Sequence, residues 1–401
     1  MNNKKIAGIV CEYNPFHLGH EYQIREIRKM GYEKIVCVMS GNTVQRGEFA
    51  IVDKYERAKT AINCGADLVV ELPYPYSSSG AEFFASAAVK ILSAAGVGTL
   101  CFGSECADID ALKRAALVCE DDLFASTYKN ISGVGVGSAT AFFEAYKLAS
   151  GENFPGGSND LLGVAYIRAI IRNELDIVPV AIKREGSAYT DGEIDGSEGY
   201  PSALMIRNSI GAGVEKIQKC LPIASFETLS QCIANKKAPC DVKNIQSAVL
   251  AFFRLADAEA LADMSIAEAG GGLAERLCKC ARIAKSYDEL VSLTSGKTYT
   301  ESRVRRAILS CMTGTTETDI RLTPAYSTVL AFNNVGREIL AALRKAEAEI
   351  AFVTKPADAA SLSESSARQK HLSEKVDALF TLAKPTPTES GEYIARSPYI
   401  I

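Results

Sequence analysis

The sequence predicts an α/β fold in which a parallel sheet covered by helices occupies residues 1–213 and a mainly helical domain occupies residues 214–401. In the first half, short apolar runs alternate with helical patterns, which is typical of βαβ units and a parallel sheet. From residue 214 onward helical periodicity dominates and strand signals are few. The length of 401 residues also agrees with two or three domains.

The elements of this fold can be placed from local patterns. Apolar runs that end in Gly, Pro or polar residues predict strands at 6–11, 34–39, 67–73, 99–102 and 176–184. Asp53, with Glu56 three residues later, predicts a capped helix that runs to about residue 64. Further helical patterns cover residues 79–95, 108–120, 137–148, 159–173, 245–256, 272–286, 297–309 and 337–351.

The composition is that of a globular protein without membrane segments. Hydrophobic residues make up 47% of the chain and charged residues 23%, both ordinary values. No apolar run reaches the roughly 18 residues of a membrane span, and the beginning MNNKKIAGIV lacks the features of a signal peptide. We therefore expect a cytoplasmic protein with no membrane partner. The 12 Cys are scattered without a CxxC pair, so we expect no zinc site.

The segment NPFHLGH, which follows the first strand, has the outline of a phosphate site. Pro15 disfavours helix at Asn14, so the strand ends there. His17 and His20 stand three residues apart around Gly19, and this spacing places both imidazoles on one face of a first helical turn. Backbone N–H groups at a helix start favour an anion, and a glycine permits its close approach. The alternative is that the two His only cap a helix.

Other strand ends can converge on the same edge of the sheet, where ligands of parallel sheets bind. The fifth strand ends in Lys183 and Arg184. Ser202 is expected to cap a helix and to direct its hydroxyl at a phosphate, and Arg207 can reach the same anion as a planar fork.

We interpret this convergence as a site for attack on the α-phosphate of ATP. His17 and His20 would stabilise the growing charge, while Arg184 and Arg207 would hold the leaving pyrophosphate. Mg²⁺ is expected to enter with the triphosphate. Glu12 and Glu105 are further candidates for contacts near the nucleotide.

A second cluster of cations lies in the helical half. KTYTESRVRRAIL at residues 297–309 contains Lys297, Arg303, Arg305 and Arg306, and Arg303 shares a helix face with Arg306. One interpretation is a solvated helix surface, and the other is contact with an RNA backbone. The mildly uneven charge of the chain permits a nucleic-acid partner without requiring one.

Several longer motifs resemble those of one enzyme family. HLGH at residues 17–20 looks like the HxGH motif of the nucleotidylyltransferase superfamily, and SALMIR at 202–207 is similar to its second phosphate motif, although poorer in Ser and Thr. The chain also resembles the tRNA(Met) cytidine acetate ligase family in CEYNPFHLGH, VMSGNTVQRGEFAIVDKYERA, DLVVELP, CFGSE, SNDLLGVAYIRAI, AIKREG and KTYTESRVRRAIL. This resemblance covers most of the chain. It implies a Rossmann-like nucleotidylyltransferase domain over 1–213, followed by a helical, tRNA-binding domain.

The resemblance also implies a reaction and its site residues. ATP and acetate would form acetyl-adenylate and pyrophosphate, and the acetyl group would pass to the N4 amine of the wobble cytidine of elongator tRNA(Met). His17 and His20 would be catalytic, and Lys297, Arg303, Arg305 and Arg306 would contact tRNA. Because acetyl-adenylate hydrolyses readily, we expect the Gly- and Asp-rich segment 186–199 to act as a lid. The expected ATP-binding residues are Val10, Cys11, Glu12, Tyr13, Asn14, Pro15, Phe16, His17, Gly19, His20, Gly103, Asn159, Arg184, Ser202 and Arg207.

Two other functions remain open at this point. The first is a nucleotidylyltransferase that acts on a small cofactor precursor, although such a domain does not need a helical half of this length. The second is a non-catalytic RNA-binding protein that uses the arginine-rich helix, although the intact His pair argues against it. Acetate specificity and the oligomeric state do not follow from the residues.

Overall fold

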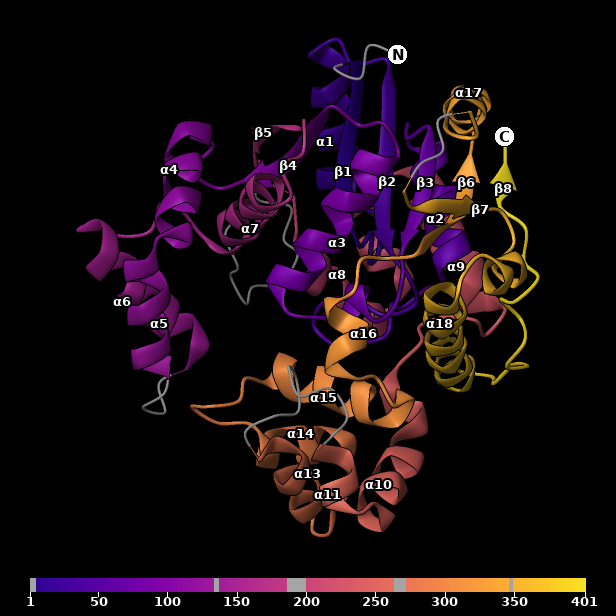
Figure 1. The fold of residues 1–401 in the computed structure, drawn as a ribbon. Helices are drawn as coiled ribbons and strands as arrows, with labels where there is room; N and C mark the ends of the chain where they lie inside the picture. Colours follow the sequence, from indigo (N-terminus) through magenta and orange to yellow (C-terminus); the bar gives the residue numbers. More distant parts are fainter. Residues whose placement is uncertain (1–4, 133–136, 186–199, 263–271, 346–348) are drawn as a thin grey trace.

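A mixed, mainly parallel sheet forms the centre of the molecule (Figure 1). The computed structural model describes residues 5–132, 137–185, 200–262, 272–345 and 349–401. In these residues the strand order is β5-β4-β1-β2-β3-β6-β7, with β8 beside β6. The strands are β1 Ile6–Cys11, β2 Lys34–Ser40, β3 Leu68–Leu72, β4 Thr99–Ser104, β5 Val178–Lys183, β6 Tyr326–Phe332, β7 Ala351–Val353 and β8 Tyr399–Ile400.

The first five strands confirm the predicted α/β core and fix where its chain order reverses. β1 pairs in parallel with β2 on one side and with β4 on the other. β3 and β5 extend this parallel arrangement outward. The chain therefore runs outward from β1 to β3 and then returns to the other side of β1. In such sheets ligands bind beyond the carboxyl ends of the strands at this reversal, which is between β1 and β4 here.

Helices cover both faces of the sheet because its strands alternate between two cores. One core contains Ile9 of β1 together with Ile24 and Ile27 of α1, and the other contains Val36 and Val38 of β2 with residues of α3, α4 and α7. The helices of the first half are α1 Leu18–Lys29, α2 Lys54–Asn63, α3 Ala81–Ala94, α4 Ile109–Glu120, α5 Asp122–Ser132, α6 Ser138–Ser150, α7 Ser158–Arg172 and α8 Ala203–Ser209.

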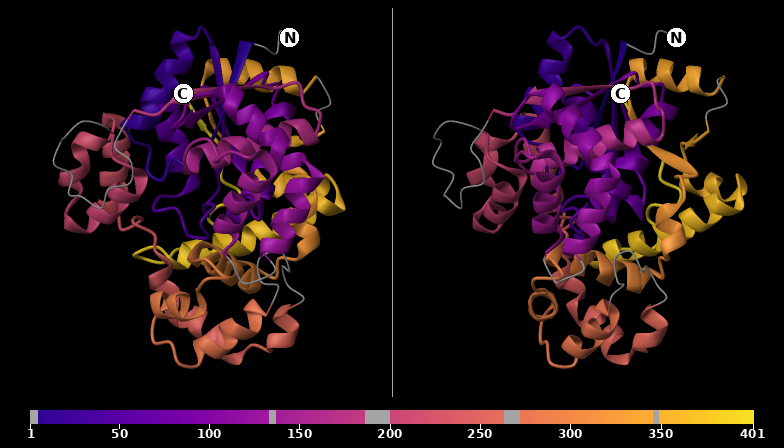
Figure 2. Two further views of the ribbon diagram at one scale, coloured as in Figure 1. Left: turned by 90° about the vertical axis from the view of Figure 1, so that its left-hand side faces the viewer. Right: turned by 60° about the vertical axis from the view of Figure 1, so that its left-hand side comes forward.

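The middle of the second half is helical, as the sequence predicts. The α-helices described in the whole second half are α9 Ile223–Ala234, α10 Gln246–Leu255, α11 Ala258–Ala262, α13 Leu273–Ala281, α14 Tyr287–Thr294, α15 Glu301–Thr313, α16 Glu317–Arg321, α17 Asn334–Leu343 and α18 Glu364–Leu382. In all the views, α10, α11, α13 and α14 form a lobe at one end of the molecule, with α15 between this lobe and the sheet (Figures 1 and 2). Short 3-10 helices occupy Tyr76–Ser78, Ile210–Ala212, Val214–Cys220, Val242–Ile245 and Pro356–Ser361.

The end of the chain returns to the sheet, which the expectation of few strands after residue 214 misses. β6 pairs antiparallel with β3, with Leu68 opposite Phe332. β7 and β8 then pair with β6. All seven residues of β6 are buried, because β3, β7 and β8 pair with its edges and helices such as α2 and α17 pack against it. The sheet is therefore mixed rather than wholly parallel, and the mainly helical second half contributes three strands to it.

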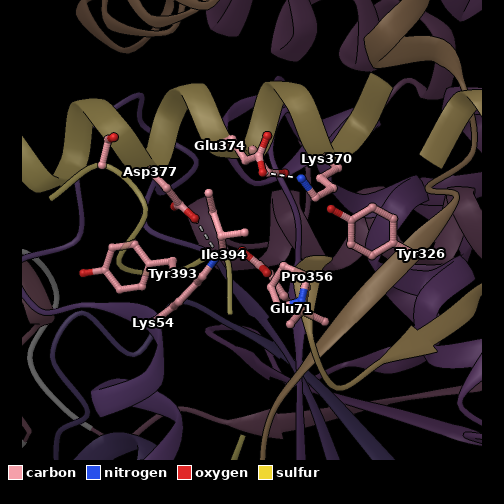
Figure 3. Close-up of a pocket in the computed structure, with 12 residues that line it drawn as sticks. Lys54, Glu71, Tyr326, Pro356, Lys370, Glu374, Asp377, Tyr393 and Ile394 are labelled. Carbon is pink, nitrogen blue, oxygen red and sulfur yellow. Dashed lines mark hydrogen bonds and ion pairs between the residues drawn. The ribbon is translucent and has the colours of Figure 1, made fainter. Parts of the chain in front are cut away.

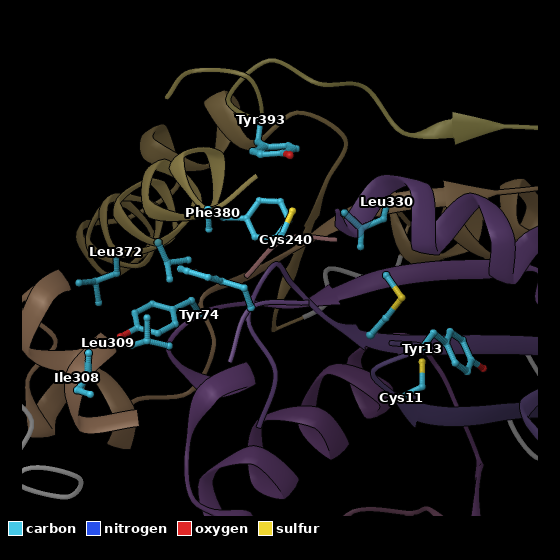
Figure 4. Close-up of a cluster of buried hydrophobic side chains, with 14 of the residues drawn as sticks. Cys11, Tyr13, Tyr74, Cys240, Ile308, Leu309, Leu330, Leu372, Phe380 and Tyr393 are labelled. Atoms are coloured by element: carbon cyan, nitrogen blue, oxygen red, sulfur yellow. The ribbon is translucent and has the colours of Figure 1, made fainter. Parts of the chain in front are cut away.

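The two halves also share a hydrophobic core. Cys11 and Tyr13, at the end of β1, belong to the same buried cluster as Leu330 of β6, Phe380 of α18 and Tyr393 (Figure 4). Phe380 and Tyr393 pack ring to ring, with centroids 6.1 Å apart. Removing α18 from this cluster would expose apolar surface close to Cys11 and Tyr13, where the segment with the two His begins.

The segment 186–199, expected to be a lid, lies outside the described residues. Among the helices that the structure describes, none combines the length and the apolar character needed to cross a bilayer.

Candidate active site

The His pair forms a reciprocal cap at the start of α1. His17 is the N-cap residue, and its Nδ1 accepts the N–H of Gly19 at 3.1 Å. His20 Nδ1 accepts the N–H of His17 at 3.2 Å, and the two rings stack with centroids 3.7 Å apart. Because Nδ1 is an acceptor in both rings, each neutral imidazole carries its proton on Nε2. Capping and ligand binding are therefore compatible, since each ring keeps an Nε2–H donor.

Both imidazoles are held neutral. Burial lowers the pKa of His17 to about 3, and the positive charges of Arg184 and Arg207 add to this shift. Burial also lowers the pKa of His20 well below its usual value, followed by the effects of His17 and Arg184. The two neutral rings can therefore offer Nε2–H donors, while Arg184 and Arg207 supply the positive charge beside them.

The remaining residues of the 10–20 segment support this arrangement. Phe16 and Tyr13 pack their rings against His20, with centroids at 5.5 Å and 4.9 Å. Tyr13 is buried and has a φ of 48°, so the chain turns sharply after β1. Val10 and Cys11 lie in β1, and Asn14 and Pro15 are buried in the turn that follows it.

Arg207 and Ser202 reach this turn from α8. The guanidinium of Arg207 donates to the carbonyl of Asn14 at 2.8 Å. Ser202 caps α8 as predicted, and its hydroxyl accepts the N–H of Met205 at 3.3 Å. The structure thus brings Arg207 to the end of β1, whereas the Ser202 hydroxyl already has a backbone partner.

A second group of predicted residues gathers at the end of β4. Glu105 accepts hydrogen bonds from the side chain and the backbone N–H of Asn159, at the start of α7. The Oδ1 of Asn159 accepts from Arg184, which follows β5, at 3.4 Å. Gly103 lies beneath Arg184, since an added Cβ would stand 3.2 Å from Arg184 Cγ. Gly103, Asn159 and Arg184 are therefore neighbours, as the family resemblance implies.

Asp160 fixes this junction between β4 and α7. It is fully buried and accepts hydrogen bonds from the hydroxyl of Ser104 and from the N–H groups of Gly157 and Cys106. Burial alone would raise the pKa of Asp160, but these hydrogen bonds outweigh it and the pKa is lowered. Asp160 is a carboxylate that sequence reasoning did not single out.

Arg57 is a second residue that sequence reasoning missed. It is buried on α2 and donates to the carbonyls of Glu12, Ser40 and Gly41, so it joins the carboxyl ends of β1 and β2. Burial lowers the pKa of Arg57 to about 10, although nearby acidic groups, first Asp53, oppose this shift. The helix sequence KYERAKTAIN has an ordinary polar pattern, so no local signal marked Arg57 as buried.

The predicted tRNA-contacting cations are not a simple solvated surface. Arg305 forms ion pairs with Glu48 at 3.5 Å and with Glu301 at 2.7 Å. Arg306 donates to the carbonyl of Gln45 at 3.4 Å. Arg303 lies over the ring of Tyr299, whereas Lys297 is exposed. Two of the four cations therefore face the loop after β2, and two remain candidates for a nucleic-acid contact.

Comparisons with known proteins agree with this geometry. A family model described as HIGH Nucleotidyl Transferase matches residues 4–392. A tRNA(Met) cytidine acetate ligase from Acetivibrio thermocellus is 35% identical over 373 residues, which cover 88% of this chain and 89% of the relative. One from Clostridium perfringens strain SM101 is 34% identical over 369 residues, covering 87% and 89%.

Solved structures show the same similarity over the full length. The structure of Thermotoga maritima TmcAL bound with alpha-thio ATP matches with a TM-score of 0.88 and 30% sequence identity, covering 99% of both chains. The apo form of that protein matches with a TM-score of 0.89. The chain therefore belongs to the HIGH nucleotidyl transferases and, within them, to the tRNA(Met) cytidine acetate ligase family.

Proposed function

We propose that this chain is an ATP-dependent ligase that activates acetate as acetyl-adenylate and transfers the acetyl group to the N4 amine of the wobble cytidine of elongator tRNA(Met). The observation that carries this proposal is the neutral, reciprocally capped His pair beside Arg184 and Arg207, in a chain whose relatives bear the name of that activity. Such an enzyme works in the cytoplasm, where ATP and tRNA are available.

In the first step, a carboxylate oxygen of acetate attacks the α-phosphorus of ATP. A new P–O bond forms, the bond to the bridging oxygen of the β-phosphate breaks, and pyrophosphate leaves. The Nε2–H groups of His17 and His20 donate to phosphate oxygens as negative charge grows there. Arg184 and Arg207 offer fixed positive charge for the pyrophosphate.

We propose that Mg²⁺ enters this site bound to the triphosphate rather than to a metal site of the protein. Within the described ranges, no group of three or more His, Cys, Asp or Glu side chains is arranged to hold a metal ion. A magnesium ion usually keeps water and phosphate oxygens as ligands when it enters with a nucleotide. It would reduce the negative charge of the triphosphate, and the chain's own residues orient the α-phosphate.

In the second step, the N4 amine of cytidine attacks the carbonyl carbon of acetyl-adenylate. The C–N bond forms, AMP leaves with the C–O bonding electrons, and the amine loses a proton. We infer that Lys297 and Arg303 contact the tRNA backbone, because Lys297 is exposed just before α15 and Arg303 lies in the first turn of that helix, whose next turn contacts the loop after β2 through Arg306.

The test is incubation with ATP, labelled acetate and elongator tRNA(Met), followed by nucleoside analysis. Label in N4-acetylcytidine is the expected result. Acetate-dependent pyrophosphate release without any label in tRNA would limit the function to adenylation. Release that depends on a pyridine nucleotide or phosphopantetheine precursor instead of acetate would favour a cofactor nucleotidylyltransferase and contradict the proposal.

A further inference from the structure

The loop after β2 lies between the His site and the C-terminal helices. This 41–48 loop, Gly41 to Glu48, closes through a turn in which the N–H of Gly47 donates to the carbonyl of Val44 at 2.9 Å. Its side toward the active site contacts Glu12, because the N–H of Gln45 donates to Glu12 Oε1 at 2.9 Å. A displacement of this loop would therefore move the Gln45 N–H away from Glu12, the carboxylate that directly follows β1.

The base of the 41–48 loop is anchored to α18 through Asn42. The side-chain amide of Asn42 donates to Asp377 Oδ1 at 2.8 Å, while Asn42 Oδ1 accepts the N–H of Lys54 at 2.9 Å. Both contacts are buried. Asn42 thus joins the loop to α18 on one side and to the first turn of α2 on the other.

A buried ion-pair cluster holds this anchor in place (Figure 3). The ammonium of Lys54 lies 2.8 Å from Glu71 and 3.0 Å from Asp377. Burial disfavours the ammonium, but Asp377 and Glu71 outweigh burial and raise the pKa of Lys54. Glu71 also limits the loop from below, since a Cβ at Gly41 would stand 2.5 Å from Glu71 Oε1. All three charges are therefore committed within the protein.

The tip of the 41–48 loop is anchored separately to α15. An added Cβ at Gly47 would stand 2.5 Å from the backbone nitrogen of Arg306, so the loop and the helix meet backbone to backbone. Glu48 adds an ion pair with Arg305 at 3.5 Å. The loop is thus fixed from two helices that follow it by more than 250 positions in the sequence.

We propose that Asn42 and Asp377 are positioning residues for acetate adenylation, which hold the 41–48 loop and through it Glu12 in the geometry that the reaction requires. This inference rests on the proposed function, because adenylation is the step it affects. It assigns α18 a role in the chemistry of a site that α18 does not itself line. Ala at position 377 removes the acceptor of the Asn42 amide, yet Lys54 keeps Glu71 as a partner.

The test compares Asp377→Ala, Asp377→Asn and Asn42→Ala in acetate-dependent ATP–pyrophosphate exchange. Asp377→Ala is expected to lower kcat by at least about 10-fold, with a smaller change in KM for ATP, because misplacement of about 1 Å near reacting atoms can cost up to 100-fold. Asp377→Asn retains an amide oxygen that can accept from Asn42, so it should restore most of the rate. If the two residues act through one contact, the kcat of the double variant Asn42→Ala, Asp377→Ala should be no lower than that of Asn42→Ala alone.

The control is Arg368→Gln, which breaks a different ion pair of α18, one that is only partly buried. Arg368 bonds Asp319 at 2.7 Å and neither residue touches the 41–48 loop in the contacts described. The Arg368→Gln variant should have a lower thermal stability than the wild type and an unchanged kcat. Equal kcat losses in Arg368→Gln and Asp377→Ala would show a merely structural effect and overturn the inference.

Amide hydrogen exchange separates this inference from the proposed function. In the full chain, Asp377→Ala should accelerate exchange in the peptide that contains residues 41–48, and Arg368→Gln should not. If the wild type shows no acetate-dependent ATP–pyrophosphate exchange, the proposed function is refuted. Amide hydrogen exchange would still decide whether Asp377 holds the loop. Unchanged protection of 41–48 in Asp377→Ala would overturn the inference even with an active wild type.

Discussion

Replacing His17 by Asn separates its capping role from its role toward ATP. Asn also provides a side-chain oxygen at an N-cap, so the stability at pH 8 should change by only about 1 kcal/mol or less. The Nε2–H donor is lost, however. Removing one preorganised donor to a developing oxyanion typically costs about 100- to 1000-fold in kcat. We expect such a loss in acetate-dependent ATP–pyrophosphate exchange, with the fold intact.

The structure also predicts how much unfolding free energy the wild type loses through His17 as the pH falls. Burial, with Arg184 and Arg207, lowers the pKa of His17 to about 3 in the folded state. The unfolded state, with a pKa near 6.5, therefore binds the proton more strongly, and the stability that is present above pH 6.5 is lost as the pH falls toward 3. At about 1.36 kcal/mol per unit, the loss from His17 reaches roughly 2 kcal/mol at pH 5.

Urea unfolding at pH 8, 7, 6 and 5 measures this loss. The wild type should lose roughly 2 kcal/mol more than His17→Asn between pH 8 and pH 5, since Asn does not titrate. His20 is present in both proteins and contributes to both curves. Parallel curves for the two proteins would contradict a buried, neutral His17, and an unchanged kcat would contradict its role as a donor.

Three further predictions follow from contacts elsewhere. Gly47→Val should lower the free energy of unfolding by at least about 2 kcal/mol, because φ is 78° and the backbone of α15 blocks the new Cβ; Gly31→Ala, at a φ of 88° with nothing within 4 Å, is the control and should cost about 1 kcal/mol. Cys106 is the exposed cysteine among those described, so iodoacetamide should label it first. ATP should slow this labelling, because Glu105 and Asn159 lie beside Cys106. Faster labelling of Cys64 than of Cys106 would contradict the prediction. Arg303→Ala should weaken tRNA binding and reduce its salt dependence by about one phosphate contact, without changing ATP–pyrophosphate exchange; an unaltered salt slope would remove Arg303 from the interface.

The sequence was informative wherever local chemistry determines structure. A run of apolar residues followed by a proline turn and a capped helix is a local pattern, so β1, α1 and the position of His17 and His20 could be predicted. The caps of α2 at Asp53 and α8 at Ser202 are equally local and are confirmed.

Features that depend on distant partners could not be predicted in the same way. YSTVLAF, the sequence of β6, becomes a strand beside β3 because the edge of a sheet made much earlier in the chain accepts it. Arg57 and Lys54 lie in a helix with an ordinary polar pattern, and only the packed structure shows that both are buried. The link between Asn42 and Asp377 joins positions that no local pattern relates.

The pairing of β6 with β3 has a consequence for the synthesis of the chain on the ribosome. Glu71 and Ser327, which are bonded across these strands, are 256 positions apart. At roughly 5–20 residues per second, the ribosome needs about 13–50 s between them. During this interval the outer edge of β3 has no strand beside it, and an open edge is a template for pairing with another nascent chain. Protection by a chaperone, or slow translation after the first half, should therefore affect the yield of this protein more than that of a fold whose sheet is complete early.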